Sequence, residues 1–470
     1  MADKKAYRTE TDSLGPVQVP KDAHYGAQTQ RAVDNFPVSG LPMPRPFISA
    51  LGYIKGAAAA VNAELGLLDR GRASAIAKAA AEVAAGVHDA HFPVDVFQTG
   101  SGTSSNMNAN EVIASLASKP KRLVHPNDHV NMGQSSNDTV PTAILLSAAI
   151  VLERRLLPEL DHLIRSIARR TARTDVAKAV KTGRTHLMDA MPLTLKQEMD
   201  TWSAHLRQVR GHLIACRTDL HALPQGATAI GTGINAHPKF SGLIARRISK
   251  AVREAEGIRL KLQPMDSLFA GLAIPEGAVQ LSSQLRALAI ALLKISNDLR
   301  WMNSGPLAGL GEIEMQALQP GSSIMPGKVN PVIPESVGMV CAQVLGNDAT
   351  IAFAAQSGNF QLNVMLPVIA HNLLQSLEIS AGAMRILADS GIKTFKVRAD
   401  SLAGALERNP ILVTALNAII GYPKAAEIAK QAYSEGRPIV DVAAERTDLS
   451  MAELRRLLDP NRLTQGGIVD

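Results

Sequence analysis

The sequence predicts an all-α, or mainly α-helical, protein with a central bundle of long helices. Hydrophobic residues make up 46% of the chain but aromatic residues only 3%, so the core must consist mostly of Ala, Leu, Ile and Val. This composition favours helices packed at close range over a β-sandwich. Several segments also carry apolar residues at alternating steps of three and four, which is the repeat of a helix with a narrow buried seam.

These seams and the prolines define the predicted long helices. The clearest seam predicts one helix and consists of Leu281, Leu285, Leu288, Leu292, Ile295 and Leu299. A second helix is expected from Pro141 to Leu156, with a kink at Pro158, because proline lacks the backbone N–H donor. Three more are expected at residues 192–223, 334–353 and 366–387. Since narrow seams cannot be buried within one helix, we expect a bundle, and an oligomer in which bundles pack together.

Changes of pattern along the 470 residues predict three domains. Residues 1–140 contain frequent Gly, Pro and Asn breaks and shorter helical patterns, such as residues 72–87, and form an N-terminal domain. Residues 141–396 form the helical bundle. Residues 397–470 are expected to be a small helical C-terminal domain, because prolines divide this segment into short helical patterns.

The charge balance is mildly basic, with 49 Lys and Arg residues against 42 Asp and Glu residues and a net charge of +7. This excess would modestly attract a small dianion. No long basic run with interleaved aromatic residues is present, so nucleic acid is not expected as a partner.

The cysteines, the N-terminus and the apolar stretches together predict a soluble, cytoplasmic protein. Cys216 and Cys341 lie far apart in apolar helical patterns and are expected to be reduced core residues. The first eight residues lack the apolar segment of a secretory signal. The longest apolar stretch, residues 143–152, has about half of the ~20 residues that a membrane span needs. No membrane association is therefore expected.

The most informative segment is the loop at residues 321–331, Gly-Ser-Ser-Ile-Met-Pro-Gly-Lys-Val-Asn-Pro. It gathers two hydroxyls, one amine and one amide. Its glycines allow the backbone to approach a ligand closely and its prolines restrict the loop, so these donors can be aimed at developing negative charge. The loop is therefore predicted to bind an anion such as a carboxylate. An ordinary Gly/Pro surface loop is the alternative.

Two further segments place hydroxyl and amide donors before predicted helices. Residues 134–139, Gln-Ser-Ser-Asn-Asp-Thr, precede the helix expected from Pro141, where free backbone N–H groups and the helix dipole favour an anion. Helix capping would use the same residue types, but a cap needs only one of three neighbouring donors. Residues 101–103, Ser-Gly-Thr, lie similarly ahead of the helical pattern at residues 110–113, with a flexible turn as the alternative.

These motifs resemble those of the fumarase/aspartase superfamily, and within it those of the class II fumarases. The resemblance covers nearly the whole chain and includes Thr99-Gly-Ser-Gly-Thr103, Val124-His-Pro-Asn-Asp128, Gln134-Ser-Ser-Asn-Asp138, Gly183-Arg-Thr-His186, Gly231-Thr-Gly, the loop at residues 321–331 and the segment at residues 421–429. It implies a central bundle, a homotetramer with active sites shared between subunits, and reversible hydration of fumarate to L-malate. Small dicarboxylates are the implied substrates.

The resemblance also assigns roles to individual residues. The implied substrate-binding residues are Ser101, Gly102, Thr103, Ser135, Ser136, Asn137, Thr185, Ser323, Lys328, Val329 and Asn330. A second carboxylate site is implied at Arg122, His125, Pro126, Asn127 and Asp128. The family pairs a histidine with a glutamate, and these correspond to His186 and Glu335. Thr185 and His186 are expected to open a long helix, and Glu335 to begin the helix after the loop.

The implied catalytic residues are Ser322, His186 and Glu335. Removing a proton next to a carboxylate places a second negative charge on that group, so Lys328, Asn330 and the loop N–H groups are expected to stabilise a dianion. The same donors can stabilise an alkoxide, which makes Ser322 the candidate base, while His186, supported by Glu335, handles water at the neighbouring carbon. No His, Cys, Asp and Glu cluster has metal-ligand spacing, so neither a metal nor another cofactor is expected.

Aspartase, which eliminates ammonia in place of water, is the alternative within the superfamily. Ser136 favours fumarase, because aspartases usually carry threonine there, whereas residues 226–231 and 331–335 resemble both. Met132 and Leu307 stand where the family often has lysine and arginine, which leaves the local charge open. A non-catalytic structural relative is the third alternative, and the intact catalytic residues argue against it.

Overall fold

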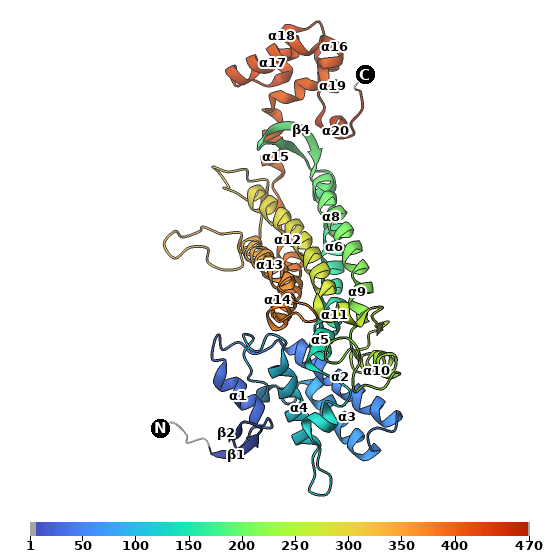
Figure 1. Ribbon diagram of the computed structural model, residues 1–470. Helices are drawn as coiled ribbons and strands as arrows, with labels where there is room; N and C mark the ends of the chain where they lie inside the picture. The colour runs from blue at the N-terminus through green and yellow to red at the C-terminus, as the bar shows by residue number, and fades with distance from the viewer. Residues whose placement is uncertain (1–5, 469–470) are drawn as a thin grey trace. The chain divides into compact units, whose positions relative to one another are not determined.

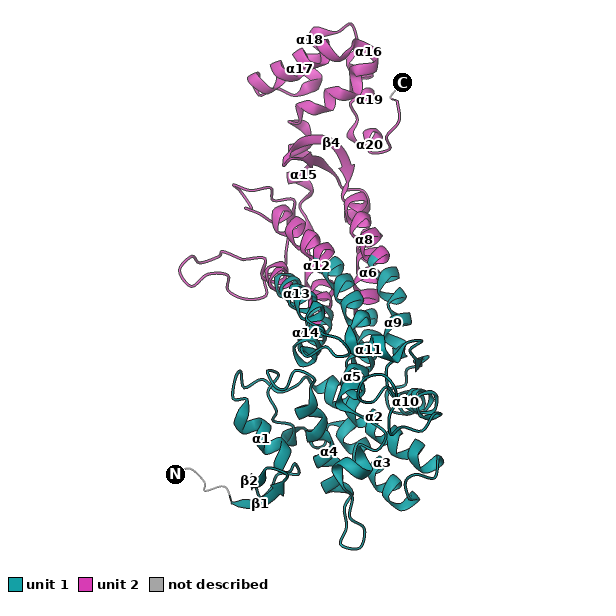
Figure 2. Cartoon of the chain, in the orientation of Figure 1, with its two compact units in different colours: residues 1–158, 209–289, 340–381 teal, residues 159–208, 290–339, 382–470 magenta. Residues whose placement is uncertain are grey.

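The protein, a computed structural model that describes residues 6–468, consists of two compact units (Figure 2). Unit 1 comprises residues 1–158, 209–289 and 340–381, and unit 2 comprises residues 159–208, 290–339 and 382–470. Helices dominate both units, and the described strands pair only in two-stranded sheets. The predicted mainly α-helical fold class is confirmed.

Unit 1 begins with an antiparallel hairpin of β1 (Tyr7–Asp12) and β2 (Gly15–Pro20). Its other elements in the first stretch are α1 (Ala27–Asn35), α2 (Arg45–Glu64), α3 (Arg70–Ala85), η1 (Asp89–His91), α4 (Thr103–Ala117), η2 (Pro126–Val130), α5 (Ser136–Val151) and η3 (Leu152–Leu156). The second stretch adds α9 (Arg217–His221), β5 (Ala222–Leu223), α10 (Phe240–Glu256), β6 (Gln263–Pro264) and α11 (Leu268–Ala273) (Figure 1).

Unit 2 contains an antiparallel hairpin of β3 (Val180–Thr185) and β4 (Met188–Thr194), and a short antiparallel pair of β7 (Ile313–Glu314) and β8 (Lys396–Val397). Its shorter helical elements are α7 (Thr174–Ala177), η4 (Leu387–Ile392), α15 (Ala399–Glu407), η5 (Pro410–Leu416), α16 (Asn417–Ile420), α17 (Tyr422–Glu435), α18 (Ile439–Arg446), α19 (Met451–Leu457) and α20 (Pro460–Leu463).

Each boundary between a stretch of unit 1 and a stretch of unit 2 falls within a long helix. These helices are α6 (Leu157–Thr171), α8 (Leu195–Ala215), α12 (Glu276–Met302), α13 (Val332–Gln356) and α14 (Leu366–Ile386). The helix predicted from the Leu281 seam is confirmed as α12, and all six seam residues are buried. The helices predicted at residues 334–353 and 366–387 are confirmed as α13 and α14, with small shifts at their ends.

Local signals set the bounds of helix α3 and its distance from α2. The side chain of Asp69 accepts a first-turn N–H and so caps the start of α3, and Gly86 ends it with a φ of 87°. Against this helix lies Gly52 of α2, where an added Cβ would come within 2.7 Å of backbone atoms of α3. The close packing of the two helices therefore requires glycine at position 52.

The helix predicted from Pro141 begins five residues earlier, at Ser136. Ser135 and Asp138 form a capping box there, which fixes the first turn before the proline is reached. The expected irregularity at Pro158 falls just before it, as the π-helical turn at Leu152–Leu156.

The prediction of one helix over residues 192–223 is wrong at both ends. Residues up to Thr194 belong to β4, α8 starts at Leu195, and the short α9 is a separate helix. The prediction that Thr185 and His186 open a helix is also wrong. Thr185 ends β3, and His186 and Leu187 form a tight turn with φ values of 54° and 60°. Positive φ at both turn residues matches the twist of a two-residue hairpin.

The last part of unit 2 has a small apolar core of its own. Its buried members are Leu412, Val413, Leu416, Ala425, Ile428, Ala432, Ile439, Val442, Ala443, Leu454, Leu457 and Leu458. The division into three domains, with boundaries after residues 140 and 396, stays a prediction.

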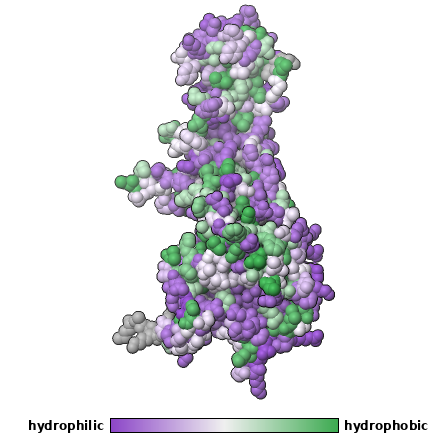
Figure 3. Space-filling model, viewed as in Figure 1, coloured by the Kyte–Doolittle hydropathy of each residue, from purple (hydrophilic) through white to green (hydrophobic). Residues whose placement is uncertain are grey.

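Helices α12 and α13 are apolar along much of their length. By length and composition alone both could cross a membrane, and 44% and 39% of their most apolar windows are buried. Core helices of water-soluble proteins meet the same criterion. In Figure 3, hydrophobic residues in green are visible over α12 and α13. Cys216 and Cys341 are buried and free, as predicted.

Candidate functional site

Unit 1 brings together the starts of two helices that the sequence had singled out. Thr103 is the first residue of α4 and Ser136 the first residue of α5. Their hydroxyl oxygens lie 2.5 Å apart. Gly102 precedes Thr103 with a φ of 74°, and an added Cβ would lie 2.9 Å from the side chain of Val140. Only glycine allows this close approach of α4 and α5.

The segment 135–137 divides its side chains between capping and contact with other segments. Ser135 Oγ accepts the Asn137 N–H at 3.2 Å, so capping accounts for Ser135. The Ser136 hydroxyl is left to contact Thr103. Asn137 Nδ2 donates to the carbonyl oxygen of Ala229 at 2.8 Å. Capping therefore uses only one of the three predicted donors.

Asp138 fixes the start of α5 to a distant loop. Its carboxylate is fully buried and accepts the Ser135 N–H at 2.9 Å on Oδ1. Oδ2 accepts the N–H groups of Gly226 and Thr228, both at 2.9 Å. Burial raises the pKa of Asp138 to about 6, against the effect of these hydrogen bonds.

A buried lysine binds the segment just before the same helix start. Lys55 Nζ donates to Asn131 Oδ1 at 2.8 Å and to Gln134 Oε1 at 3.1 Å. Asn106 Nδ2 reaches both Asn131 Oδ1, at 3.3 Å, and Ser136 Oγ, at 3.1 Å. Burial lowers the pKa of Lys55 to about 7. A continuous set of polar contacts thus leads from Lys55 to the Ser136 hydroxyl.

Three residues of this network, Lys55, Asn106 and Asn131, were not among the predicted site residues. A signal was available for two of them. Lys55 is a single charge within the apolar stretch of α2, and Asn106 belongs to the closely spaced run Asn106, Asn108 and Asn110 in a helix that is buried for most of its length. Because a buried polar group needs partners, such residues indicate a polar network.

In unit 2 the loop predicted to bind an anion projects as an open segment before α13 (Figure 1). Ser322 Oγ accepts the N–H groups of Ile324, at 3.2 Å, and Met325, at 3.0 Å. Asn330 Nδ2 donates to the Gly321 carbonyl oxygen at 2.5 Å and closes the base of the loop. Lys328 is exposed near its end, and Ser323 and Val329 are exposed too.

A pocket of about 780 Å³ lies at the base of this loop. Among its lining residues are Lys328, Asn330 and Glu335, which are three of the predicted site residues. Asn303 and Arg398 also line the pocket and were not predicted. Glu335 lies in the first turn of α13, so its predicted place at the start of that helix is confirmed.

His186 lies at the exposed tip of the β3–β4 hairpin in unit 2. Strand β3 of this hairpin is held by ion pairs of Glu312, which contacts Lys181 at 2.6 Å and Arg184 at 2.7 Å. His186 and Glu335 are both exposed on this chain. Their pairing stays a prediction.

The predicted second carboxylate site lies at a turn of unit 1. His125 caps the π-helical turn that Pro126 opens, and its Nδ1 lies 3.2 Å from the Asp128 carboxylate. Asn127 is part of the same turn, while Arg122 precedes it at a β-bridge with Lys119. The role of this turn stays a prediction.

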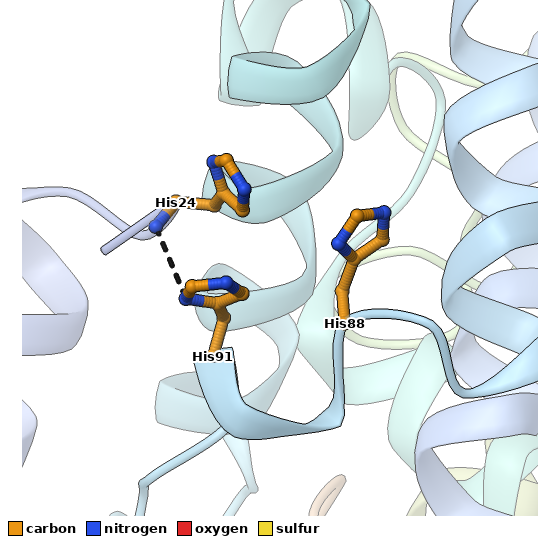
Figure 4. A group of neighbouring side chains, drawn as sticks. All are labelled: His24, His88 and His91. Carbon is orange, nitrogen blue, oxygen red and sulfur yellow. Dashed lines mark hydrogen bonds between the residues drawn. The ribbon is translucent and has the colours of Figure 1, made fainter. Parts of the chain in front are cut away.

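One group of histidines has a geometry that could hold a metal ion, which the spacing in the sequence does not reveal. One ring nitrogen from each of His24, His88 and His91 lies within 4.8 Å of the others (Figure 4). The sequence shows only the spacing of His88 and His91, and the fold supplies the distant His24. None of the three belongs to the predicted catalytic or substrate-binding residues.

Comparison with known proteins decides the family. A sequence profile described as lyase matches residues 15–346, and one described as the fumarase C C-terminus matches residues 412–465. Fumarate hydratase class II of Xylella fastidiosa (strain 9a5c) is 58% identical over 469 residues, which cover 100% of this chain and 98% of that protein. The chain belongs to the class II fumarate hydratase family.

A further relative and two solved structures are similar to this chain over nearly its whole length. Fumarate hydratase class II 2 of Pseudomonas aeruginosa is 58% identical over 464 residues, covering 98% of this chain and 99% of that protein. The class II fumarase of Schistosoma mansoni has a TM-score of 0.93 at 36% identity, covering 98% and 99% of the two chains. A fumarate lyase:delta crystallin structure from Brucella melitensis, described as bound to cobalt, has a TM-score of 0.89 at 41% identity, covering 98% and 100%.

Replacing Asp138 by Asn tests its role in holding the start of α5. An amide keeps one acceptor and turns an NH2 group towards backbone donors, so the free energy of unfolding should fall by on the order of 3 kcal/mol. Urea unfolding followed by circular dichroism measures the change. The control is Asp69→Asn, an exposed helix cap where Asn serves as well as Asp. Equal effects of the two substitutions would contradict the proposed role.

Proposed function

We propose that this chain catalyses the reversible hydration of fumarate to L-malate. The observation that carries the proposal is its 58% identity, over essentially the full length, to proteins named fumarate hydratase class II. Small dicarboxylates are then its substrates, and the reaction makes it a hydro-lyase. We place it in the cytoplasm, where free thiols such as those of Cys216 and Cys341 stay reduced.

Ser322 is proposed as the base that takes the proton from the carbon next to a carboxylate of malate. A serine hydroxyl becomes a base only when its oxygen is stabilised as an alkoxide. The N–H groups of Ile324 and Met325 both point at Ser322 Oγ and would stabilise that charge. These two N–H contacts are the structural support for Ser322 as the base.

Lys328 and Asn330 are proposed to stabilise the second negative charge that appears on the substrate carboxylate. Both line the 780 Å³ pocket with Glu335. An ammonium group placed there attracts the substrate in the ground state and the dianion more strongly. The loop is closed at its base by Asn330, so the donors keep their directions while charge develops.

His186 is proposed to handle the departing hydroxyl. When Ser322 has taken the carbon proton, the C–O bond of the neighbouring carbon breaks, and the hydroxide receives a proton from His186 through a water molecule. In the hydration direction the steps are reversed: His186 takes a proton from water, and Ser322 returns a proton to the carbon. Glu335 is proposed to orient His186 and raise its basicity.

Thr103, Ser136 and Asn137 are proposed to bind the other carboxylate of the substrate. Thr103 and Ser136 open α4 and α5, where free N–H groups and helix dipoles favour an anion. Ser101, Gly102, Ser135, Thr185, Ser323 and Val329 are proposed to complete the binding site, as the family resemblance implies.

A homotetramer with active sites shared between subunits is proposed for the assembly. Exposed apolar side chains on α12 and α13 support it: Ile290, Met339 and Phe353 are 56%, 69% and 62% exposed. The hairpin tip beside His186 is apolar as well, with Leu187 67% exposed. Monomeric soluble proteins rarely expose so many large apolar side chains to water. A further copy of the chain would cover them.

The substrate is tested by offering L-malate and L-aspartate separately and following fumarate by its ultraviolet absorbance. We expect rapid conversion of malate and at most trace conversion of aspartate. Activity after treatment with a chelator should be unchanged, because no metal takes part in the proposed chemistry. Ammonia release comparable to malate dehydration would move the chain to the aspartases, and activity restored only by a divalent ion would overturn metal-free catalysis.

The proposed base is tested by Ser322→Ala. We expect kcat to fall by several orders of magnitude with little change in KM, because the interaction is made chiefly in the transition state. Lys328→Met should impair both parameters, and Glu335→Gln should cost roughly 10-fold to 100-fold in rate. Ser434→Ala, at an exposed position on α17, is the matched control. Near-normal turnover of Ser322→Ala would pass the role of base to another group.

Shared active sites are tested by mixing two inactive variants, Ser322→Ala and His186→Asn, under conditions that exchange subunits. If a site takes these residues from different chains, some sites in the hybrid contain both intact groups, and partial activity should return. Hybrid formation is verified by a mass tag on one variant. Inactive hybrids would indicate that each site is built within one chain.

A further inference from the structure

Three histidines from two segments of unit 1 face one another. His24 lies in the segment between β2 and α1, while His88 and His91 lie on the turn that follows α3. The rings of His24 and His91 are 4.3 Å apart at 61°, and those of His24 and His88 are 5.5 Å apart at 90°. Figure 4 shows these edge contacts turning ring nitrogens towards a common space, where they lie within 4.8 Å of one another.

The Glu82 carboxylate orients the His88 ring from the side away from the other two histidines. Glu82 Oε2 lies 3.0 Å from His88 Nε2, which leaves Nδ1 of His88 for the cluster. A ligand histidine whose second nitrogen contacts a carboxylate is the usual arrangement in metal sites, because the carboxylate orients the ring and raises its basicity. Among the described residues, the one hydrogen bond to the His91 ring is long, 3.4 Å from the His24 main-chain N–H to Nδ1, so this ring can turn with little loss.

The surroundings keep the rings available as ligands. All three histidines are half-buried, so their rings are reachable from solvent. Neutral imidazole is the form that binds metals. Charges of opposite sign lie near these rings: the positive Arg8 acts on His24, and the negative Asp22 acts on His91. Arg8 is itself engaged by Glu10 at 2.7 Å.

We propose that His24, His88 and His91 form a binding site for one divalent transition-metal ion of the Zn²⁺ class, with Glu82 positioning His88. Imidazole ligands suit Zn²⁺, Co²⁺, Ni²⁺ and Cu²⁺, whereas Mg²⁺ and Ca²⁺ prefer oxygen. Three imidazoles leave a fourth position for water. Small rotations of the rings bring the nitrogens to the metal. The ion links the segment before α1 to the turn after α3, and it takes no part in fumarate hydration.

The test uses the full-length protein after removal of metals with a chelator and dialysis. Titration with Zn²⁺ by calorimetry should give one site per chain, and Co²⁺ should give the visible absorption of a nitrogen-ligated ion. Saturating Zn²⁺ should also raise the melting temperature, because the ion binds only the folded chain. Absence of one-to-one binding, or binding of Mg²⁺ with equal strength, would overturn the proposal.

Variants identify the ligands. His24→Asn and His91→Asn should each abolish the Co²⁺ absorption, and Glu82→Gln should weaken Zn²⁺ affinity roughly 10-fold to 100-fold while leaving the ligands in place. His205→Ala, an exposed histidine on α8, is the control and should bind as the parent does. Circular dichroism checks that each variant is folded, and Glu82→Gln keeps the test decisive if a histidine variant is not. Unchanged binding in folded His24→Asn and Glu82→Gln would place the ion elsewhere.

Discussion

The geometry around the start of α5 depends on one buried carboxylate. Asp138 accepts three backbone N–H groups: that of Ser135 at the start of α5, and those of Gly226 and Thr228 in a distant loop. A buried charge is stable only when hydrogen bonds replace the water it has lost, so all three donors must be in place together. Asn137 contacts the same loop through Ala229. The directions of the hydroxyl and amide groups at this helix start therefore follow from satisfying Asp138.

The long helices were predictable because their signal is local. The seam from Leu281 to Leu299 repeats along one face, and each seam residue is buried in α12. The hairpin at residues 180–194 was not predictable in this way. Its strands are held by pairing with each other and by Glu312, which lies more than a hundred residues away. The positive φ values of His186 and Leu187 result from that pairing, and the spacing of apolar residues does not reveal them.

Candidate site residues were predictable where a motif is continuous. The loop at residues 321–331 and the segment 135–137 were found from their donors, and Thr103 and Ser136 are in contact as expected of one site. The supporting residues were missed because they act from other segments. Lys55 is 76 positions from Asn131, which it contacts, and His24 is 67 positions from His91. Only the fold brings such pairs together.

The interleaving of the two units constrains the order in which the chain can fold as it is made. A nascent chain that has emerged to residue 289 contains two of the three stretches of unit 1 and one of the three stretches of unit 2. The last stretch of unit 1 ends only at residue 381, so neither unit is complete until most of the chain has left the ribosome. Contacts between distant segments form slowly. During that interval Ser282 and Arg286 of α12 lack Asp348 of α13, which both contact. Incomplete units of this kind expose apolar surface, which molecular chaperones can cover.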